Sequence, residues 1–154
     1  MSEYVRTTRE CSLDELRPEL AAAIRAQIQQ YKLDTVESTA LMCVESTSTK
    51  QKKGLFGSAE TIHMGVLLTP KWLIWGAGKQ GEKPAVISAR LQDLIIQDYE
   101  KSAMYKIMPD VGMNVTGRYT DVTQQGMSFI GLGPEPAAQK FRQALHEAVD
   151  KANA

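Results

Sequence analysis

The sequence has few cysteines and no excess of either charge. Its 154 residues include two cysteines, and Lys+Arg and Asp+Glu number 18 each, so the formal net charge is zero. Two cysteines in no recognisable pattern indicate a reducing compartment. A balanced charge excludes electrostatic attraction of the whole molecule to nucleic acid. Any electrostatic function must therefore come from local groups of residues.

Long hydrophobic runs are also missing. No stretch approaches the roughly 20 apolar residues that a membrane helix needs. The opening MSEYVRTTREC has no apolar core of the signal-peptide type. The length suffices for one domain with a sizeable core, and no internal repeat is visible. We therefore expect a single-domain cytoplasmic protein.

The clearest strand pattern lies on either side of Thr69, Pro70 and Lys71. Apolar and polar or small residues alternate before this turn, with the period of two expected of a strand. After it, one side of the strand carries Trp72 and Ile74, and the other carries Leu73 and Trp75. A strand that is apolar on both sides must be covered twice, by the core and by a helix or another subunit. Trp72, Leu73 and Trp75 are therefore the predicted interface residues.

A helix is predicted near the amino terminus. Ser12 and Glu15 have the spacing of a capping box. Pro18 allows two outcomes, either a short turn followed by a helix that starts at the proline, or one kinked helix. The apolar stripe of this helix comprises Leu20, Ile24, Ile28 and Tyr31.

A second amphipathic helix is predicted at the carboxyl terminus. Prolines and an acid in Gly133-Pro-Glu-Pro136 suit a helix start. Its apolar stripe comprises Phe141, Ala144, Leu145, Ala148, Val149 and Ala152, and its polar side comprises Lys140, Arg142, Gln143, Glu147 and Asp150. About seven strands joined by short turns lie between the helices, so we expect an α+β protein, mainly β, with antiparallel strands.

Two segments are similar to those of a known family. They are Leu67-Leu-Thr-Pro-Lys-Trp-Leu-Ile-Trp75 and the strand Phe129-Ile-Gly-Leu132 that leads into the helix around Phe141. The chain resembles a pleckstrin-homology-like (PH-like) domain, as in the bacterial PH-like and GRAM families. The resemblance implies a bent antiparallel barrel with a C-terminal capping helix, and binding or assembly rather than catalysis. Residues 34–154 would form this domain, and residues 1–33 an arm and an extra N-terminal helix packed on it.

The strongest functional signal is Lys50-Gln-Lys-Lys-Gly-Leu-Phe-Gly57. Phosphates would attract Lys50, Lys52 and Lys53, and the apolar Leu55 and Phe56 could enter an interface. By the family resemblance, this loop joins the first two strands of the domain. In lipid-binding members of the family, the corresponding loop carries basic residues toward a phosphoinositide headgroup. At about 1 kcal/mol for each lysine, binding would be weak and salt-sensitive. The alternative is a solvated loop whose two apolar residues fold onto the core.

Other motifs do not indicate chemistry. Gly76-Ala-Gly-Lys-Gln-Gly81 matches G-x-G-x-x-G, but Pro84 and a β-branched pair follow where a dinucleotide site needs a helix. His63 and His146 lack a second ligand at an indicative spacing, so no metal site is predicted. No nucleophile elbow occurs. We expect neither an enzyme nor a cofactor.

These observations predict a non-enzymatic binding or assembly module. Its partner would be another protein or a second copy of the chain, with weak binding to an anionic membrane surface through the basic loop, and no nucleic acid. The alternative is a small-molecule cup or an enzyme built on a curved antiparallel sheet.

Overall fold

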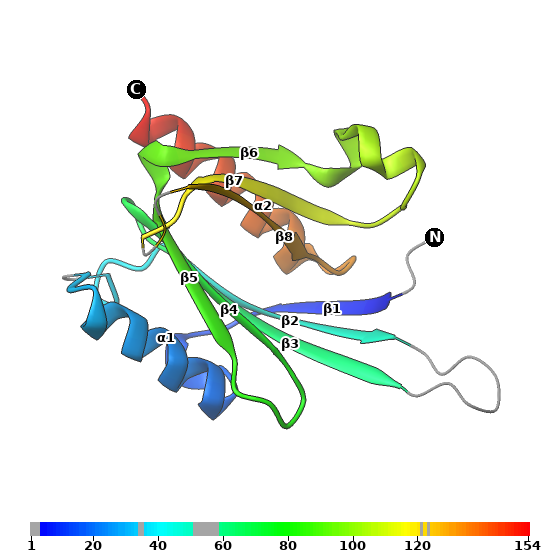
Figure 1. The fold of residues 1–154 in the computed structure, drawn as a ribbon, viewed down its shortest axis with the longest axis horizontal. Helices are drawn as coiled ribbons and strands as arrows, with labels where there is room; N and C mark the ends of the chain where they lie inside the picture. Colours follow the sequence, from blue (N-terminus) through cyan, green and yellow to red (C-terminus); the bar gives the residue numbers. More distant parts are fainter. Residues whose placement is uncertain (1–3, 34–35, 51–58, 121, 123) are drawn as a thin grey trace.

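A computed structural model describes residues 4–33, 36–50, 59–120, 122 and 124–154. The described residues form two antiparallel sheets (Figure 1). Sheet A contains, in spatial order, β1 (Tyr4–Glu10), β2 (Met42–Lys50), β3 (Glu60–Leu68), β4 (Trp72–Lys79) and β5 (Ala85–Arg90). Sheet B contains β6 (Leu94–Asp98), β7 (Gly112–Arg118) and β8 (Gln125–Gly131). The helices are α1 (Pro18–Gln30) and α2 (Pro136–Ala152), with short 3-10 turns η1 (Leu13–Glu15), η2 (Leu91–Asp93), η3 (Tyr99–Lys101) and η4 (Ala103–Lys106).

The predicted class, α+β and mainly β, is confirmed. The strand count is higher than predicted because the segment that we predicted as an arm contains β1. This strand pairs with β2 along its whole length, from Tyr4 opposite Lys50 to Glu10 opposite Val44. β1 is thus an edge strand of sheet A. The two sheets do not close into one continuous barrel, since no ladder joins them in the described chain.

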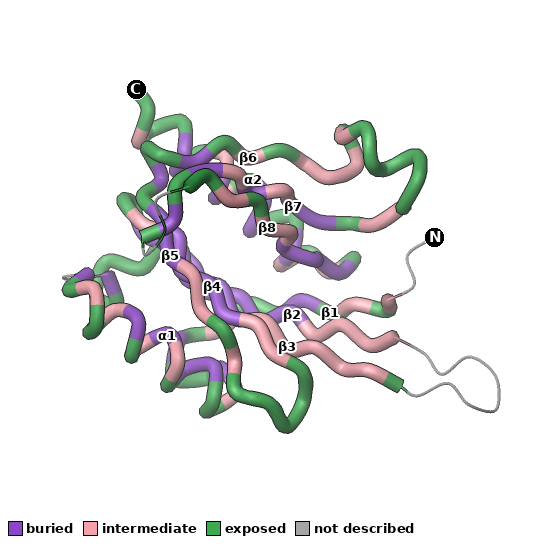
Figure 2. The backbone as a smooth tube through the Cα atoms, viewed as in Figure 1, coloured by how far each residue is buried: buried purple, intermediate pink, exposed green. Residues whose placement is uncertain are grey.

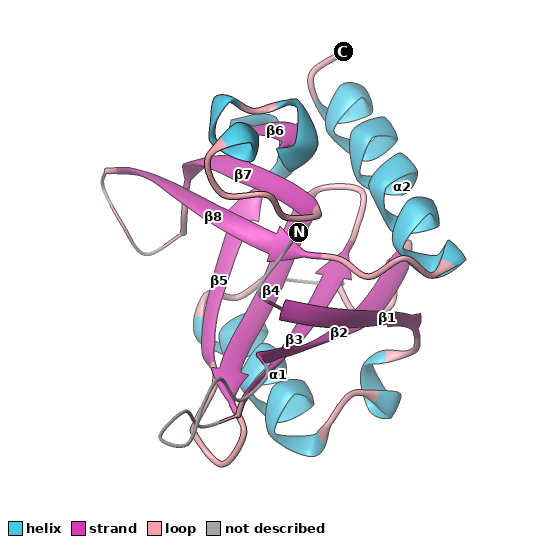
Figure 3. Cartoon of the chain, turned by 90° about the vertical axis from the view of Figure 1, so that its right-hand side faces the viewer, coloured by secondary structure: helices cyan, strands magenta, loops and turns pink. Residues whose placement is uncertain are grey.

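The main core lies between the two sheets, and α2 closes it along one side (Figure 3). The predicted apolar stripe of α2 is confirmed, with Phe141 and Leu145 completely buried and Ala148 and Val149 nearly so. Neither α-helix in the described chain is long and apolar enough to cross a bilayer. The purple segments in Figure 2 mark the buried interior.

The first of the two outcomes predicted for the N-terminal helix is found. The backbone N–H of Ser12 donates to Glu15 Oε1 at 2.8 Å, which completes the capping box of η1. A new helix, α1, then begins with Pro18 at its first turn. α1 lies across the outer face of sheet A, and a Cβ on Gly65 would lie 3.1 Å from Leu16 Cδ1. Because Gly65 has no side chain, the segment that leads into α1 can approach sheet A closely.

β4 is covered on both faces, as predicted. Leu73 and Trp75 face the core between the sheets, whereas Ile74 and part of Trp72 pack under α1. Leu73 is 0% exposed and Trp75 3%. These two residues therefore have no surface for a partner, which corrects their assignment as interface residues. Trp72 is half-buried, with the Arg90 guanidinium 5.5 Å from its ring centroid.

Two predicted boundaries were wrong. Residues 34–47 are rich in Thr, Val and Ser and alternate, which predicts a strand over that whole range, but β2 begins only at Met42. The glycines and lysines between Gly76 and Pro84 predict a loop, but β4 continues as far as Lys79. A Cβ on Gly76 would lie 2.9 Å from Val86 Cγ2, and one on Gly78 would be similarly close to Pro84. Here glycine permits tight strand pairing, and no helix follows to bind a dinucleotide phosphate.

Candidate functional site

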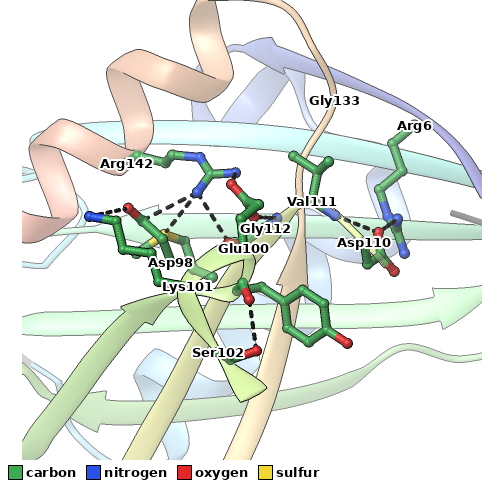
Figure 4. A network of polar contacts seen from close by, with 12 residues as sticks. Arg6, Asp98, Glu100, Lys101, Ser102, Asp110, Val111, Gly112, Gly133 and Arg142 are labelled. Atoms are coloured by element: carbon green, nitrogen blue, oxygen red, sulfur yellow. Dashed lines mark hydrogen bonds and ion pairs between the residues drawn. The ribbon is translucent and has the colours of Figure 1, made fainter. Parts of the chain in front are cut away.

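Two arginines, Arg142, which is buried, and Arg6, whose side chain is 9% exposed, hold the connection between β6 and β7 (Figure 4). We call residues 99–111, which include η3 and η4, the clamped loop. One arginine comes from α2 and the other from β1, so elements from both ends of the chain position the same loop. Sequence reasoning assigned no structure or role to most of this segment.

Arg142 bridges the two ends of the clamped loop. Its side chain is 8% exposed, and Nη1 lies 3.2 Å from Asp98 Oδ1 before the loop. Nη2 lies 2.8 Å from Glu100 Oε2. Nη1 also donates to the carbonyl oxygen of Gly112, beyond the loop, at 3.2 Å. One guanidinium thus joins a carboxylate pair to the start of β7, with the fork geometry that distinguishes arginine from lysine.

Further hydrogen bonds strengthen this junction. Glu100 Oε1 accepts from the backbone N–H of Gly112 at 3.0 Å, and His146 Nε2 lies 3.2 Å from Asp98 Oδ1. Burial raises the pKa of Asp98, but the hydrogen bond to His146 and the charge of Arg142 outweigh it, so the pKa lies below its usual range. The carboxylate form of Asp98 is therefore favoured in the folded protein.

Arg6 holds the far end of the loop. Its guanidinium pairs with Asp110 and lies 5.4 Å from the centroid of the Phe129 ring. Within the loop, the Tyr99 hydroxyl donates to the Met108 carbonyl oxygen at 2.6 Å. These contacts fix the path of the chain at the loop base, since each joins residues that are distant along the loop or outside it.

The tip of the clamped loop is exposed, apolar and basic. Ile107 is 75% exposed and Met108 62%, and Met104 and Tyr105 are also exposed. Lys101 and Lys106 are exposed beside them. The acids of the loop, Glu100 and Asp110, are both engaged by the arginines. The charges that face solvent at the tip are therefore positive.

The outer face of sheet B continues this apolar surface. Ile95, Thr116 and Met127 lie opposite one another on its three strands. Their neighbour Val115 is buried in the core, so alternation along β7 directs Thr116 and its partners outward. Ile95 is 68% exposed and Met127 71%. The ring of Phe129, 5.1 Å from that of Tyr99, connects this face to the clamped loop.

The predicted basic loop falls largely outside the described residues. Lys52, Lys53, Leu55 and Phe56 belong to that undescribed segment, and Lys50 is the last residue of β2. The end of β2 and the start of β3 flank this segment. In Figure 1, these two strand ends lie toward the same end of the molecule as the clamped loop.

Two surface hollows bear on the small-molecule alternative. One, of about 530 Å³ between α1 and the β4–β5 turn, is lined by three alanines of α1 and by residues 81–84. The other, of about 450 Å³, is lined by Trp72 with Lys71, Arg90 and Lys151, among others. Neither brings together a nucleophile and a base from the described residues. The second nevertheless gives Trp72, the remaining predicted interface residue, a basic setting.

The two histidines do not meet. His63 lies in β3 and His146 lies in α2 beside Asp98. The described part of the chain contains no group of three or more His, Cys, Asp or Glu side chains that could hold a metal ion. His146 is half-buried, and its contact with Asp98 supports the loop base.

Sequence reasoning missed the clamp because it placed Arg142 on the polar side of α2. The structure buries this side chain to meet the loop, since charge alone does not reveal a partner far along the chain. One signal was present, namely methionines, tyrosine and isoleucine mixed with lysines in a stretch with neither helical nor strand periodicity.

No known protein family, curated protein or solved structure matches this chain.

Proposed function

We propose that this protein is a non-enzymatic binding module that attaches reversibly to anionic lipid surfaces through the clamped loop. One observation carries the proposal. The buried Arg142 and the largely buried Arg6 hold the loop base, while Ile107 and Met108 at its tip are mostly exposed beside lysines. Exposed apolar side chains add no stability to the folded protein. Held in place by a fixed loop base, they form a preorganised surface that loses less conformational entropy on binding.

The chemistry of the tip suits a charged membrane interface. Lys101 has a 77% exposed side chain, and its Nζ lies 3.8 Å from Asp98, a long contact. No described acidic side chain pairs with Lys106. Lysines flank apolar groups and Tyr105, the combination in which ammonium groups meet lipid phosphates while apolar side chains enter the acyl boundary.

The expected affinity is low. Two lysines near an anionic surface contribute about 2 kcal/mol. Burial of Ile107 and Met108 contributes about 1.5 kcal/mol each. Together these correspond to a dissociation constant on the order of 0.1 mM for one loop. Such binding is reversible and salt-sensitive, and self-association or a second contact would strengthen it through effective concentration.

The order of elements supports a PH-like architecture as part of this proposal. After β1 and α1, four antiparallel strands, β2 to β5, precede the three strands of sheet B and then the closing helix α2. The loop between β2 and β3, with Lys50, Lys52 and Lys53, corresponds to the basic loop of lipid-binding members. It would supply the second contact, because β2 ends and β3 begins on the side of the clamped loop (Figure 1).

Vesicle co-sedimentation tests the proposal. The protein should bind vesicles of phosphatidylserine and phosphatidylcholine at low salt, and pure phosphatidylcholine vesicles less. Replacing Lys101 and Lys106 with glutamine should weaken binding about five-fold for each lysine and reduce its salt dependence. The double change Ile107→Ser and Met108→Ser should weaken binding at both low and high salt.

Leu41→Ser is the matched control, because Leu41 is 54% exposed, comparable with Met108, but lies outside both the clamped loop and sheet B. It should bind like the unchanged protein. Equal binding by all of these variants would exclude the clamped loop as a lipid contact. Equal binding to neutral and anionic vesicles would exclude a preference for anionic lipid.

Self-association through the outer face of sheet B is a second candidate. The observation that favours it is the row of Ile95, Thr116 and Met127 on three adjacent strands, which a twofold partner could cover with the same row. Sedimentation velocity should show a dimer whose population rises with concentration and falls in Ile95→Asp. A monomer throughout the concentration range would exclude this candidate.

A further inference from the structure

The fold brings the two cysteines of the chain together. Cys11 and Cys43 are 32 residues apart in sequence, yet their Sγ atoms lie 4.0 Å apart. Cys11 follows directly after β1, and its backbone N–H donates to the Cys43 carbonyl oxygen at 3.0 Å. This hydrogen bond continues the β1–β2 ladder by one position, so the backbone itself holds the two thiols opposite each other.

The pair lies at a surface hollow that opens to solvent. A surface hollow of about 350 Å³ is lined by both cysteines together with Glu10, Ser12 and Leu41, among others. Cys11 is half-buried, whereas Cys43 is buried among the residues packed under α1. A small reagent that enters the hollow therefore meets Cys11 first, with Cys43 behind it.

The surroundings shift the pKa values of the two thiols in opposite directions. The hydrogen bond from Cys43 lowers the pKa of Cys11, burial opposes this, and the positive charge of Arg9 assists it. The pKa of Cys43 is raised by the same hydrogen bond and by its burial. Cys11 is thus the better thiolate, and Cys43 keeps its proton longer.

We propose that Cys11 and Cys43 form a dithiol site that small peroxides oxidise to an intramolecular disulfide. The Cys11 thiolate attacks one oxygen of hydrogen peroxide, the O–O bond breaks, and hydroxide leaves, so that Cys11 becomes a sulfenic acid. Cys43 Sγ then attacks Cys11 Sγ, the S–O bond breaks, and the oxygen departs as water with the Cys43 proton. Two electrons pass from sulfur to the peroxide, which yields a disulfide and water.

The geometry permits this closure with little backbone movement. A disulfide bond is about 2.05 Å long, so the two Sγ atoms must approach by about 2 Å. Directly opposed residues of an antiparallel pair have Cα atoms about 4.5–5.5 Å apart, which lies within the range that disulfides span. Rotation of the half-buried Cys11 side chain supplies the approach, because the hollow leaves it space.

The disulfide would close a loop that contains η1 and α1. Residues 12–42 lie between the two cysteines, and within them α1 covers the outer face of sheet A. A cross-link that restricts the unfolded chain stabilises the folded one. Oxidation should therefore strengthen the attachment of α1 to sheet A and raise the melting temperature by several degrees.

The test exposes the reduced full-length protein to one equivalent of hydrogen peroxide. Intact mass spectrometry should show the loss of two hydrogens from a monomer, and peptide mapping under non-reducing conditions should show a Cys11–Cys43 link. The melting temperature should rise and return to its initial value on reduction. Retained free thiols, or cross-links between molecules only, would overturn the proposal.

Two single variants separate the roles of the thiols. Cys43→Ser should accumulate a sulfenic acid on Cys11 that dimedone traps, because the second thiol is missing. Cys11→Ser should react at least about ten times more slowly with peroxide, since the remaining thiol is buried and protonated. Equal rates for the two variants would contradict the assignment of Cys11 as the attacking group. Circular dichroism establishes that each variant is folded. If a variant does not fold, the peroxide experiment on the unchanged protein still tests the proposal.

Discussion

The outer faces of the two sheets differ in what covers them. On sheet A, Leu67 and Ile74 pack under α1 and are almost completely buried. On sheet B, Ile95 and Met127 occupy the corresponding outward positions and remain mostly exposed. The chain thus places its longest connection, from β1 to β2, over one sheet and leaves the other uncovered within the described residues.

This difference separates a face that stabilises from a face that is available for contact. Apolar side chains under α1 contribute to folding through burial, and their loss creates cavities. Apolar side chains on sheet B and on the clamped loop contribute little to folding, because they remain in water. Substitutions on the two faces should therefore have opposite profiles, with large effects on stability at sheet A and large effects on binding at sheet B.

The largest stability effect is expected under α1. Ile24 is completely buried between α1 and sheet A, and Ile24→Ala should cost about 3 kcal/mol in the free energy of unfolding. Urea denaturation measures this value. Met127→Ala on the other sheet is the matched change and should stay within about 0.5 kcal/mol of the unchanged protein. Similar losses at both sites would refute the contrast between the faces.

A somewhat smaller effect is expected at the base of the clamped loop. Arg142→Ala removes the partner of Asp98 and Glu100 and should cost about 2–3 kcal/mol, less than a fully buried pair, because both carboxylates keep some contact with water. Lys140→Ala on the same helix breaks an exposed pair with Glu10 and should cost at most about 1 kcal/mol. Thermal or urea unfolding distinguishes the two. Equal costs would mean that the clamp is not a structural support.

Hydrogen exchange sharpens the second prediction. In Arg142→Ala, the amide of Gly112, which donates to Glu100, should exchange faster, because both ends of the loop lose their common partner. Amides in β3 serve as the internal reference and should change only with global stability. Unchanged relative protection of Gly112 would show that Arg142 is not needed to hold the loop base.

The smallest effect concerns acid. The folded pKa of Asp98 lies below its usual value, so its stabilising contribution is present above the unfolded pKa of about 3.9 and is lost as the pH falls through the lower folded pKa. Asp98→Asn should therefore cost less than about 1 kcal/mol at neutral pH, and the difference from the unchanged protein should shrink below about pH 4. Asp93→Asn, at an exposed aspartate of η2, is the control. If the difference in the free energy of unfolding grows on acidification, the pKa of Asp98 is not lowered by folding and this prediction is wrong.

Several parts of the fold were predictable from local patterns. The turn at Pro70 and the two-sided apolar β4 follow from alternation and turn chemistry. The start of α1 at Pro18 and the buried stripe of α2 follow from capping residues and helical spacing. The boundary errors near Met42 and Gly76 arose because glycine and small polar residues serve both loops and closely paired strands.

The candidate site was not predictable in the same way. The sequence pointed to Lys50 and its neighbours, because adjacent lysines are visible without knowing any contact. The clamped loop depends on Arg142 meeting Asp98 and on Arg6 meeting Asp110, and the second pair spans 104 residues. No periodicity encodes such a meeting.

The amino-acid sequence by itself determined the helices, the central hairpin and the mainly β class, since hydrophobic period, turn residues and capping groups act over a few neighbouring residues. Only the tertiary structure decided which arginines are buried, which loop they hold and that Cys11 meets Cys43 across β1 and β2. The physical reason is that these contacts depend on sheet register and on the packing of α2, which bring together side chains whose distant partners the local sequence does not specify.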